Sequence, residues 1–427
     1  MIRDRIVANK GIFIAIFKFI LAIIAIWLFI ELILFIYRNW HRLSTPGNIA
    51  DIKKQQLSAL EGRWAGLSHN KAGLDSQFAK IPEDQRLLIN VSVFSTRVTG
   101  FMGPYKSGVY DEDNATRLAL SSGSRCLVLE IDYEDGVYNP LLVYRDGWGM
   151  KRSLNAGSIK TVAKSIAARA FNPQNDGVPA SVASDPLFVV LYFLRTPPQS
   201  NSKAYLRFLG AVGEQLYPLR DYLVAQTPQG DYRRQALESQ LFFTNYTVFK
   251  NKIILMTNVD TSGFRKLNTL GLAGELGPNQ DLDFMTHVRM YGREFPSPFG
   301  VTGRPVGSIK PAAVVTSPGY WIITPSDRSA DAVESTKEAW SLVMEPVTSA
   351  TNQPVKETVD TLLTTYGVHS IPTTIFADAK DTKAIETKLV WTVKPELLRF
   401  IPPKPIVLQI PYKESNSGGG AVVSPKL

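Results

Sequence analysis

Cysteine and histidine are both scarce in this sequence of 427 residues, which has one cysteine, Cys126, and four histidines. One thiol can form neither an internal disulfide nor a cysteine-based metal site, so the stability of the chain must come from a packed core. No GxGxxG or GxxxxGKS/T loop follows a predicted strand, which leaves a nucleotide-binding fold without support. Basic residues do not cluster in one element of the main domain, which argues against nucleic acid as a partner.

The longest apolar run covers residues 11–37 and is interrupted only by Lys18 and Glu31. It exceeds the roughly 20 residues that a helix needs to cross the hydrocarbon core of a bilayer. A cleavable signal peptide has a shorter apolar core of about 7–15 residues followed by small residues, whereas this run leads into Trp40 and other large side chains. The sequence therefore predicts a retained, single-pass transmembrane helix.

Four side chains of this region suit a membrane anchor. We expect Trp27 to lie within the anchor, Trp40 to lie in the aromatic belt at the membrane surface, and Lys18 to extend its ammonium group to the first boundary. Glu31 either lies near the far headgroups at modest cost or contacts a partner helix. Basic residues flank both ends of the run, so the positive-inside rule leaves the topology open.

The charge is uneven along the chain. Residues 1–54 carry eight Lys or Arg against three Asp or Glu, which is +5 of the formal net charge of +9 and leaves +4 for the rest. The basic excess therefore lies where anionic lipid headgroups would be. We expect a basic flank at 1–10, the transmembrane helix at 11–37, a juxtamembrane stalk at 38–85, one domain at 86–411 and a flexible tail rich in Ser and Gly at 412–427.

The main domain alternates short apolar runs typical of strands with helical patterns. Strands are predicted at Leu87–Phe94, Cys126–Tyr133, Leu141–Tyr144, Leu187–Phe193, Ile253–Asn258, Ala312–Thr316, Tyr320–Thr324 and Lys388–Val393. Helices are predicted at Ala115–Ser121, Ser158–Phe171, Lys203–Ala225, Tyr232–Leu241, Ala330–Glu345 and Val355–Tyr366. Buried strands separated by helices in this number favour an α/β fold of the (β/α)₈ TIM-type barrel over a doubly wound open sheet.

Two carboxylates stand out in the second predicted strand. Glu130 and Asp132 are two residues apart, so both side chains project to the same face of the strand. If that face is the interior of a barrel or its mouth, the pair is a candidate site for a hard cation such as Ca²⁺. If the strand ends at the surface, the two carboxylates merely reach solvent.

Several short motifs follow one another in a recognisable order. They are Val93-Phe94-Ser95-Thr96, Gly123 to Cys126 leading to Glu130-Ile131-Asp132, Pro140 to Gly147, Ala170-Phe171, Leu187 to Leu194, Lys250 to Leu255, and Val393 to Arg399. In this order they resemble the catalytic X region of phosphatidylinositol-specific phospholipase C across roughly residues 87–402. The resemblance implies a barrel of the PLC-like phosphodiesterases, with Glu130 and Asp132 at its metal site.

The chain departs from the resembled family at the residues that carry its chemistry. The family's two catalytic histidines fall on Phe94 or Ser95 and on Arg145, neither of which can shuttle a proton at neutral pH. Its glutamate at the end of the fourth strand falls on Leu194, and a later lysine falls near Met256.

Arginine side chains suggest a different use of the same site. Arg97 and Arg145 are candidates to hold a phosphate group with their guanidinium forks. The alternative is that both arginines are exposed to solvent or paired for structural reasons.

We therefore expect a membrane-anchored, catalytically inactive PLC-like barrel without a cofactor, acting as a structural or binding module. The lipid bilayer is its expected partner, and a phosphoinositide headgroup and capsid or other membrane proteins are further candidates. The style of the sequence is also similar to that of proteins of large eukaryotic DNA viruses, which implies the internal membrane of a virion as one location.

Two other functions stay open from the sequence. The first is an active, metal-dependent phosphodiesterase that acts on a phospholipid headgroup with Glu130, Asp132 and bound Ca²⁺. The second is a receptor or adhesion domain that faces outward and carries glycan at Asn114 or Asn245.

Overall fold

The structure is a computed structural model. It describes residues 2–39, 46–64, 73–103, 108–134, 137–145, 151–174, 178–224, 240–292, 311–317, 321, 329–344, 358, 361–363 and 365–372. The chain divides into two compact units, Met1–Ile52 and Lys53–Leu427.

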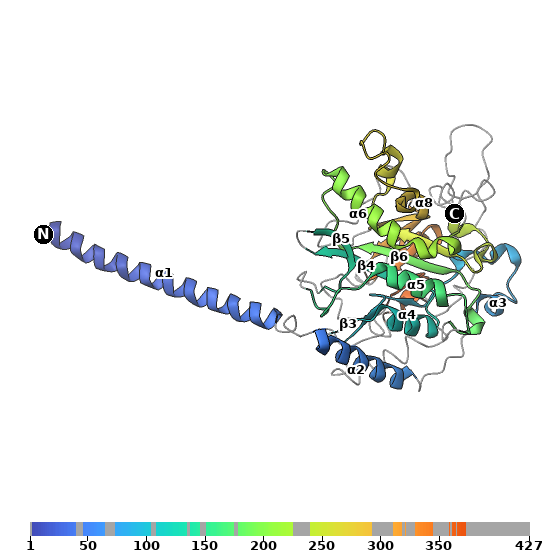
Figure 1. The fold of residues 1–427 in the computed structure, drawn as a ribbon, viewed down its shortest axis with the longest axis horizontal. Helices are drawn as coiled ribbons and strands as arrows, with labels where there is room; N and C mark the ends of the chain where they lie inside the picture. The colour runs from blue at the N-terminus through green and yellow to red at the C-terminus, as the bar shows by residue number, and fades with distance from the viewer. Residues whose placement is uncertain are drawn as a thin grey trace. The chain divides into compact units, whose positions relative to one another are not determined.

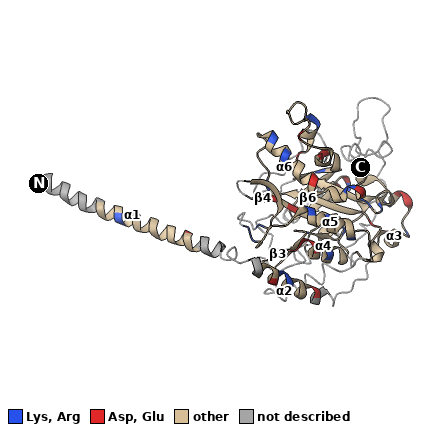
Figure 2. Cartoon of the chain, in the orientation of Figure 1, with Lys and Arg blue, Asp and Glu red and all other residues tan. Residues whose placement is uncertain are grey.

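The first unit contains one long helix, α1 (Ile2–Asn39). Its stretch Ile14–Ile33 is long and apolar enough to cross a membrane, and none of that stretch is buried. The coloured part of α1 in Figure 2 is mostly neither basic nor acidic. A signal sequence at an amino terminus would meet the same test of length and composition. Trp27 belongs to the exposed apolar surface of this stretch, and Trp40 lies outside the described residues.

The second unit is built around a parallel sheet with the strand order β1-β4-β6-β7-β8-β9-β10 (Figure 1). These strands are β1 (Ser95–Thr96), β4 (Cys126–Glu134), β6 (Leu187–Phe193), β7 (Ile253–Thr257), β8 (Val288–Gly292), β9 (Ala313–Thr316) and β10 (Trp340–Val343). Every neighbouring pair along this path is parallel. The strands were expected to be parallel because helical segments separate most of them in the sequence.

Ser370 closes the sheet into a barrel. It forms a parallel bridge to Leu342 of β10 on one side and to Val93, just before β1, on the other. The hydroxyl oxygens of Ser370 and Ser95 are 2.6 Å apart, which fixes the same closure through side chains. With Ser370 the barrel has eight strand positions, as a (β/α)₈ barrel requires. The predicted fold class is confirmed.

Alternate residues of the strands fill the barrel interior, because successive side chains of a strand point to opposite faces. The interior includes Val93, Cys126, Val128, Phe188, Val190, Ile254, Met256, Met290, Ala313, Val315, Trp340 and Leu342. Glu130 and Asp132 continue the row that Cys126 and Val128 begin in β4, so both carboxylates face the interior.

Helices α4 (Glu112–Ser121), α5 (Ile159–Arg169) and α6 (Ser202–Gln215) lie on the outside of the sheet (Figure 1). Each begins with a polar side chain that accepts a hydrogen bond from a backbone amide of the first turn. The capping residues are Asp111, Ser158 and Asn201, with distances of 3.4, 3.2 and 3.2 Å.

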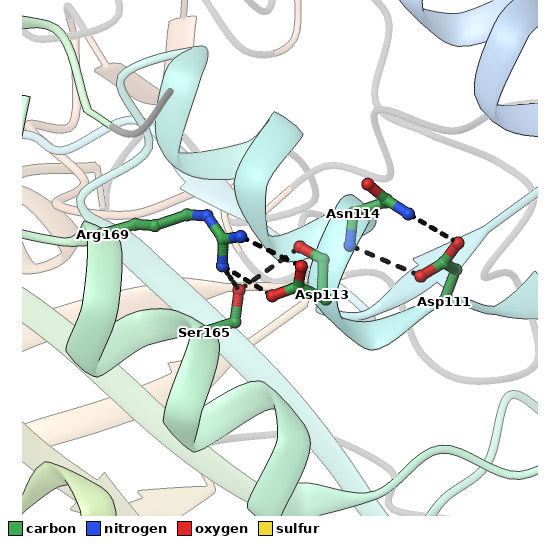
Figure 3. A network of polar contacts seen from close by, with 5 residues as sticks. All are labelled: Asp111, Asp113, Asn114, Ser165 and Arg169. Atoms are coloured by element: carbon green, nitrogen blue, oxygen red, sulfur yellow. Dashed lines mark hydrogen bonds and ion pairs between the residues drawn. The ribbon is translucent and has the colours of Figure 1, made fainter. Parts of the chain in front are cut away.

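An ion pair joins α4 to α5 (Figure 3). Arg169 donates to both carboxylate oxygens of Asp113, at 2.6 and 3.0 Å, and to Ser165 Oγ at 2.7 Å. Asn114 donates its side-chain amide to Asp111 at 2.9 Å, on the turn that begins α4. The Arg169–Asp113 pair thus links the first turn of α4 to the last turn of α5.

The remaining elements connect or flank the barrel. The helices are α2 (Pro46–Trp64), α3 (Leu74–Gln77), α8 (Leu282–Met285) and α10 (Ser329–Glu338), and the strands are β2 (Phe101–Met102), β3 (Val109–Tyr110) and β5 (Val137–Leu142). The 3₁₀ helices are Glu83–Gln85, Leu88–Asn90, Ala180–Val182, Tyr217–Tyr222, Leu241–Phe243, Tyr246–Phe249, Ser262–Lys266 and Pro278–Gln280.

Several sequence predictions need correction. The predicted strand Leu87–Phe94 holds the 3₁₀ helix Leu88–Asn90 and single bridges at Leu87 and Val93, and the strand β1 begins only at Ser95. Of the strand predicted at Leu141–Tyr144, only Leu141 and Leu142 belong to a strand, β5, which pairs antiparallel with β4 outside the main path of the sheet. The helix predicted at Ala330–Glu345 ends at Glu338 and continues as β10, because Trp340 and Leu342 join the barrel interior.

The predicted stalk is also shorter than expected. Leu74 and Phe78, which the sequence assigns to the stalk, are buried in the same hydrophobic cluster as residues of the barrel strands. Strand Lys388–Val393, the motif at 393–399 and the tail at 412–427 lie outside the described residues, as does most of the segments predicted at Tyr232–Leu241 and Tyr320–Thr324.

Candidate functional site

Glu130 and Asp132 lie near the carboxyl end of β4, the end of the barrel that we call the barrel mouth. Both side chains are fully buried. The sequence prediction that they share a face is confirmed by their common row in the strand. A buried carboxylate must be paired or hydrogen-bonded, so its neighbours decide what the site can do.

Arg97 is the partner of Glu130. It follows β1, and its Nε forms an ion pair with Glu130 Oε1. Burial lowers the pKa of Arg97, but the charge of Glu130 and the hydrogen bond to it outweigh burial, and the net pKa is raised. The guanidinium group therefore stays charged inside the protein.

The turn that carries Arg97 has an unusual backbone. Val98 has a φ of 54°, in the left-handed region that β-branched residues rarely adopt. Its side chain is buried, and the next residue, Thr99, donates its amide to Val128 of β4 at 3.0 Å. The backbone bond ties this turn to β4, the strand that carries Glu130, the partner of Arg97.

Two further arginines bind Asp132. Arg145, just after β5, pairs through Nε with Asp132 Oδ2, and Arg195, just after β6, places its Nε 2.6 Å from Asp132 Oδ1. The Arg145 and Arg195 side chains are 11% and 20% exposed, so both reach the surface of the barrel mouth. The segments after β5 and β6 thus meet at one carboxylate of β4.

Arg195 is the site residue that sequence reasoning missed. Its guanidinium group lies 4.5 Å from the centre of the Tyr133 ring and donates to the Tyr133 carbonyl at 2.6 Å. The signal was present, because Arg195 follows directly after the buried strand β6, where a parallel strand meets the barrel mouth.

A buried tyrosine adds a second kind of polar group. Burial raises the pKa of Tyr110 well above its ordinary value, and the nearby charge of Glu130 raises it further. Within the described part of the chain, neither Tyr110 Oη nor Glu130 Oε2 has a hydrogen-bond partner. These two oxygen atoms are thus buried polar groups at the Arg97–Glu130 ion pair.

The arrangement does not fit the Ca²⁺ ion that the family resemblance implies. Ca²⁺ takes six to eight oxygen ligands, whereas three of the four carboxylate oxygens of Glu130 and Asp132 already accept from guanidinium groups. The described ranges contain no group of three or more His, Cys, Asp or Glu side chains that could hold a metal ion.

Other positions singled out by the sequence lie elsewhere. Ser95 bonds to Ser370 at the barrel closure, and Phe94 is buried beside it in the chain. Leu194 and Met256, at positions where the family has charged residues, belong to the apolar interior. The structure thus brings together Arg97, Glu130, Asp132 and Arg145 and leaves the rest in the core.

The two histidines in the described residues have structural partners. His287, just before β8, accepts from the Leu255 amide at 2.9 Å, and its other ring nitrogen lies 3.0 Å from the Val224 carbonyl. His369, just before the closing residue Ser370, lies 2.9 Å from the Ile89 carbonyl. Each precedes a strand position at the amino-terminal side of the barrel, away from the strand ends that form the barrel mouth.

No family model matches the chain, and no curated protein matches it. Among solved structures, it is similar to PLC21 from L. pealei, with 13% identity and a TM-score of 0.44, over 68% of this chain and 34% of that one. The chain therefore spans about a third of the length of that protein.

Two bacterial structures match over nearly their whole length. One is a calcium-dependent phosphoinositol-specific phospholipase C from a Pseudomonas species, with 8% identity, a TM-score of 0.38, and coverage of 68% of this chain and 91% of that one. The other is a Ca²⁺-dependent phosphatidylinositol-specific phospholipase C from Streptomyces antibioticus, with 10% identity, a TM-score of 0.38, and coverage of 67% and 94%. The barrel assignment rests on the strand order and closure described above.

Proposed function

We propose that this chain is a membrane-anchored barrel of the phospholipase C type that has lost catalysis and serves as a structural or binding module. The observation that carries the proposal is the charge pattern of the barrel mouth. Glu130 and Asp132 are neutralised by three arginines, one of which, Arg145, stands where the resembled family has a catalytic histidine.

The loss of catalysis follows from proton chemistry. A guanidinium group does not give up its proton near neutral pH, so Arg145 cannot serve as a general acid or base. Loss of one general acid or base typically lowers a rate by a factor of about 10² to 10⁴, and both histidines of the family are replaced here.

The membrane anchor is supported by α1. Its apolar stretch Ile14–Ile33 is uncovered by protein among the described residues, and hydrocarbon would remove that surface from water. Retention of α1 is tested by carbonate extraction of membranes from cells that make the full chain, followed by sequencing of the amino terminus. An intact amino terminus in the membrane fraction is expected, whereas cleavage after the apolar run would mark α1 as a signal sequence.

The binding role concerns an anionic group at the barrel mouth. Arg145 and Arg195 both reach the surface there, and guanidinium groups bind phosphate oxygens well. A phosphoinositide headgroup is the ligand that we favour, with capsid or other membrane proteins as structural partners of a virion membrane. The glycosylated-receptor alternative has less support, because the Asn114 and Asn245 side-chain amides donate to Asp111 and to the Glu83 carbonyl.

The deciding experiment measures hydrolysis of phosphatidylinositol by the full chain in mixed micelles, with and without Ca²⁺. No turnover above the protein-free rate is expected. Turnover that disappears in Glu130→Ala and Asp132→Ala would replace the proposal with its alternative, an active phosphodiesterase. Binding of a soluble inositol phosphate, measured by calorimetry with wild type and Arg145→Ala, tests the binding role separately.

A further inference from the structure

We infer that Arg97, Arg145 and Arg195 take the place of a divalent cation at the barrel mouth, so that the site rejects such cations as long as these arginines are present. This inference concerns the same site as the proposed function but not its activity. A chain without catalysis could still bind Ca²⁺, and a chain that rejects Ca²⁺ could still hydrolyse a lipid.

The first argument is which atoms are occupied. Both carboxylate oxygens of Asp132 accept from guanidinium nitrogens, and Oδ1 also accepts from the Tyr133 amide at 2.7 Å. Glu130 Oε1 accepts from Arg97, which leaves Oε2 as the one oxygen of the pair without a hydrogen-bond partner among the residues that the structure describes. One carboxylate oxygen is far short of the shell that Ca²⁺ or Mg²⁺ requires.

The second argument is charge. A cation bound to Glu130 or Asp132 would lie within a few ångströms of guanidinium groups that hold the same carboxylates, in a site where the carboxylates are fully buried. Like charges repel strongly where water is excluded, and arginine cannot relieve the repulsion by losing its proton. The cation would have to displace the arginines, which would then lose their carboxylate partners.

The third argument is where the arginines come from. Arg97, Arg145 and Arg195 follow β1, β5 and β6, so each enters from a different part of the barrel and converges on β4. A shared cation would join the same strand ends. The guanidinium groups therefore hold these strand ends together as a bound cation would. The site needs no metal ion to keep its shape.

The test uses Tb³⁺ as a luminescent probe of Ca²⁺ sites, excited through nearby tyrosines such as Tyr110, with the full chain in detergent micelles. Wild type is expected to show no saturable Tb³⁺ site that depends on Asp132. The double variant R97Q/R195Q is expected to bind Tb³⁺ at least tenfold more tightly than wild type, and adding Asp132→Asn should abolish the gain. Arg207→Gln, which removes an exposed ion pair with Glu275, is the matched control and should gain nothing.

Two results would overturn the inference. One is saturable binding of Tb³⁺ or Ca²⁺ by wild type that is lost in Asp132→Asn. The other is a double variant that melts cooperatively but gains no site. If the double variant does not fold, the melting temperature of wild type in Ca²⁺ and in EDTA decides, because a bound ion raises it and a rejected ion leaves it unchanged.

Failure of this inference can be told apart from failure of the proposed function. Lipid turnover that is indifferent to Ca²⁺ would end the proposed inactivity and leave the cation replacement standing. Ca²⁺ binding by wild type without turnover would end the inferred cation replacement and leave the proposed inactivity standing.

Discussion

The amide of Leu74 donates to both carboxylate oxygens of Asp185, at 3.2 and 3.1 Å, across 111 residues of sequence. This contact seats α3 against the amino-terminal end of the barrel, because Asp185 lies just before β6. Arg125, Asp75 and Lys250 are the charged groups that act on the Asp185 carboxylate. The first segment of the domain is thereby tied to its middle.

The stability of the barrel should depend on pH through Asp185. Burial raises the pKa of Asp185 to about 6, although Arg125 and the Leu74 amide oppose the rise. A carboxyl group with a raised pKa binds its proton more tightly in the folded chain, so the free energy of unfolding increases as the pH falls from about 7 toward 4. We expect a gain of about 1 kcal/mol between pH 7 and pH 5.

Melting of the full chain in micelles at both pH values measures this effect, with Asp185→Asn as the control that cannot titrate. The gain on acidification should be larger in wild type than in the variant. Equal pH dependence in the two proteins would contradict the assignment.

Removal of the Asp132 carboxylate should be costly. In Asp132→Ala, Arg145 and Arg195 lose the acceptor that they share, and breaking a buried pair by removing one partner typically costs about 3–5 kcal/mol. The free energy of unfolding by denaturant is the measurement. Glu275→Ala, which breaks only an exposed pair with Arg207, should leave the midpoint unchanged, and a similar effect of both substitutions would refute the argument.

Asn251 occupies a backbone position that suits glycine. Its φ is 56°, in the left-handed region, and it lies between Lys250 and Lys252 just before β7. We expect Asn251→Gly to be nearly neutral and Asn251→Val to cost about 1–2 kcal/mol, because a side chain with a branched Cβ crowds the carbonyl in the left-handed region. Asn268→Val, at an exposed position without positive φ, is the control for thermal melts, and an equal loss at both positions would count against the backbone explanation.

Cys126 provides a probe of global unfolding. Its thiol is fully buried, and burial raises its pKa to about 12. Since the thiolate is the reactive form, a thiol reagent at pH 8 should label the native chain only as fast as the barrel opens. Labelling should become immediate in denaturant, and because the chain has no other cysteine, a single signal reports the rate. Rapid labelling of the native protein would contradict the buried position.

The strands that the sequence predicts well are those buried on both faces. Leu187–Phe193 is predicted with its observed bounds, and Cys126–Tyr133 and Ile253–Asn258 differ from β4 and β7 by one residue at the end. Continuous apolar runs mark such strands clearly. Strand β8 was missed because its partly exposed Arg289 and Tyr291 break the apolar run.

The candidate site was predictable only in part. The spacing of Glu130 and Asp132 in one strand fixes their common face, and that part could be derived from the pleat. The ion pairs themselves could not be derived, because Arg97 and Arg195 are 33 and 63 residues away from Glu130 and Asp132 in sequence and meet them only through strand order and closure. A pattern in one strand carries no information about which loops of other strands converge on it.

The contact between Ser95 and Ser370 spans 275 residues. The segment of β1 therefore cannot pair with Ser370, its second neighbour in the barrel, until nearly the whole domain has been synthesised. At about 5–20 residues per second, this delay is of the order of 10–60 seconds on the ribosome. During that time one edge of β1 has no strand to pair with, and an unpaired edge is a site for wrong association. Because β1 has only two residues, its unpaired edge is short, and few backbone groups are available for pairing with other nascent chains.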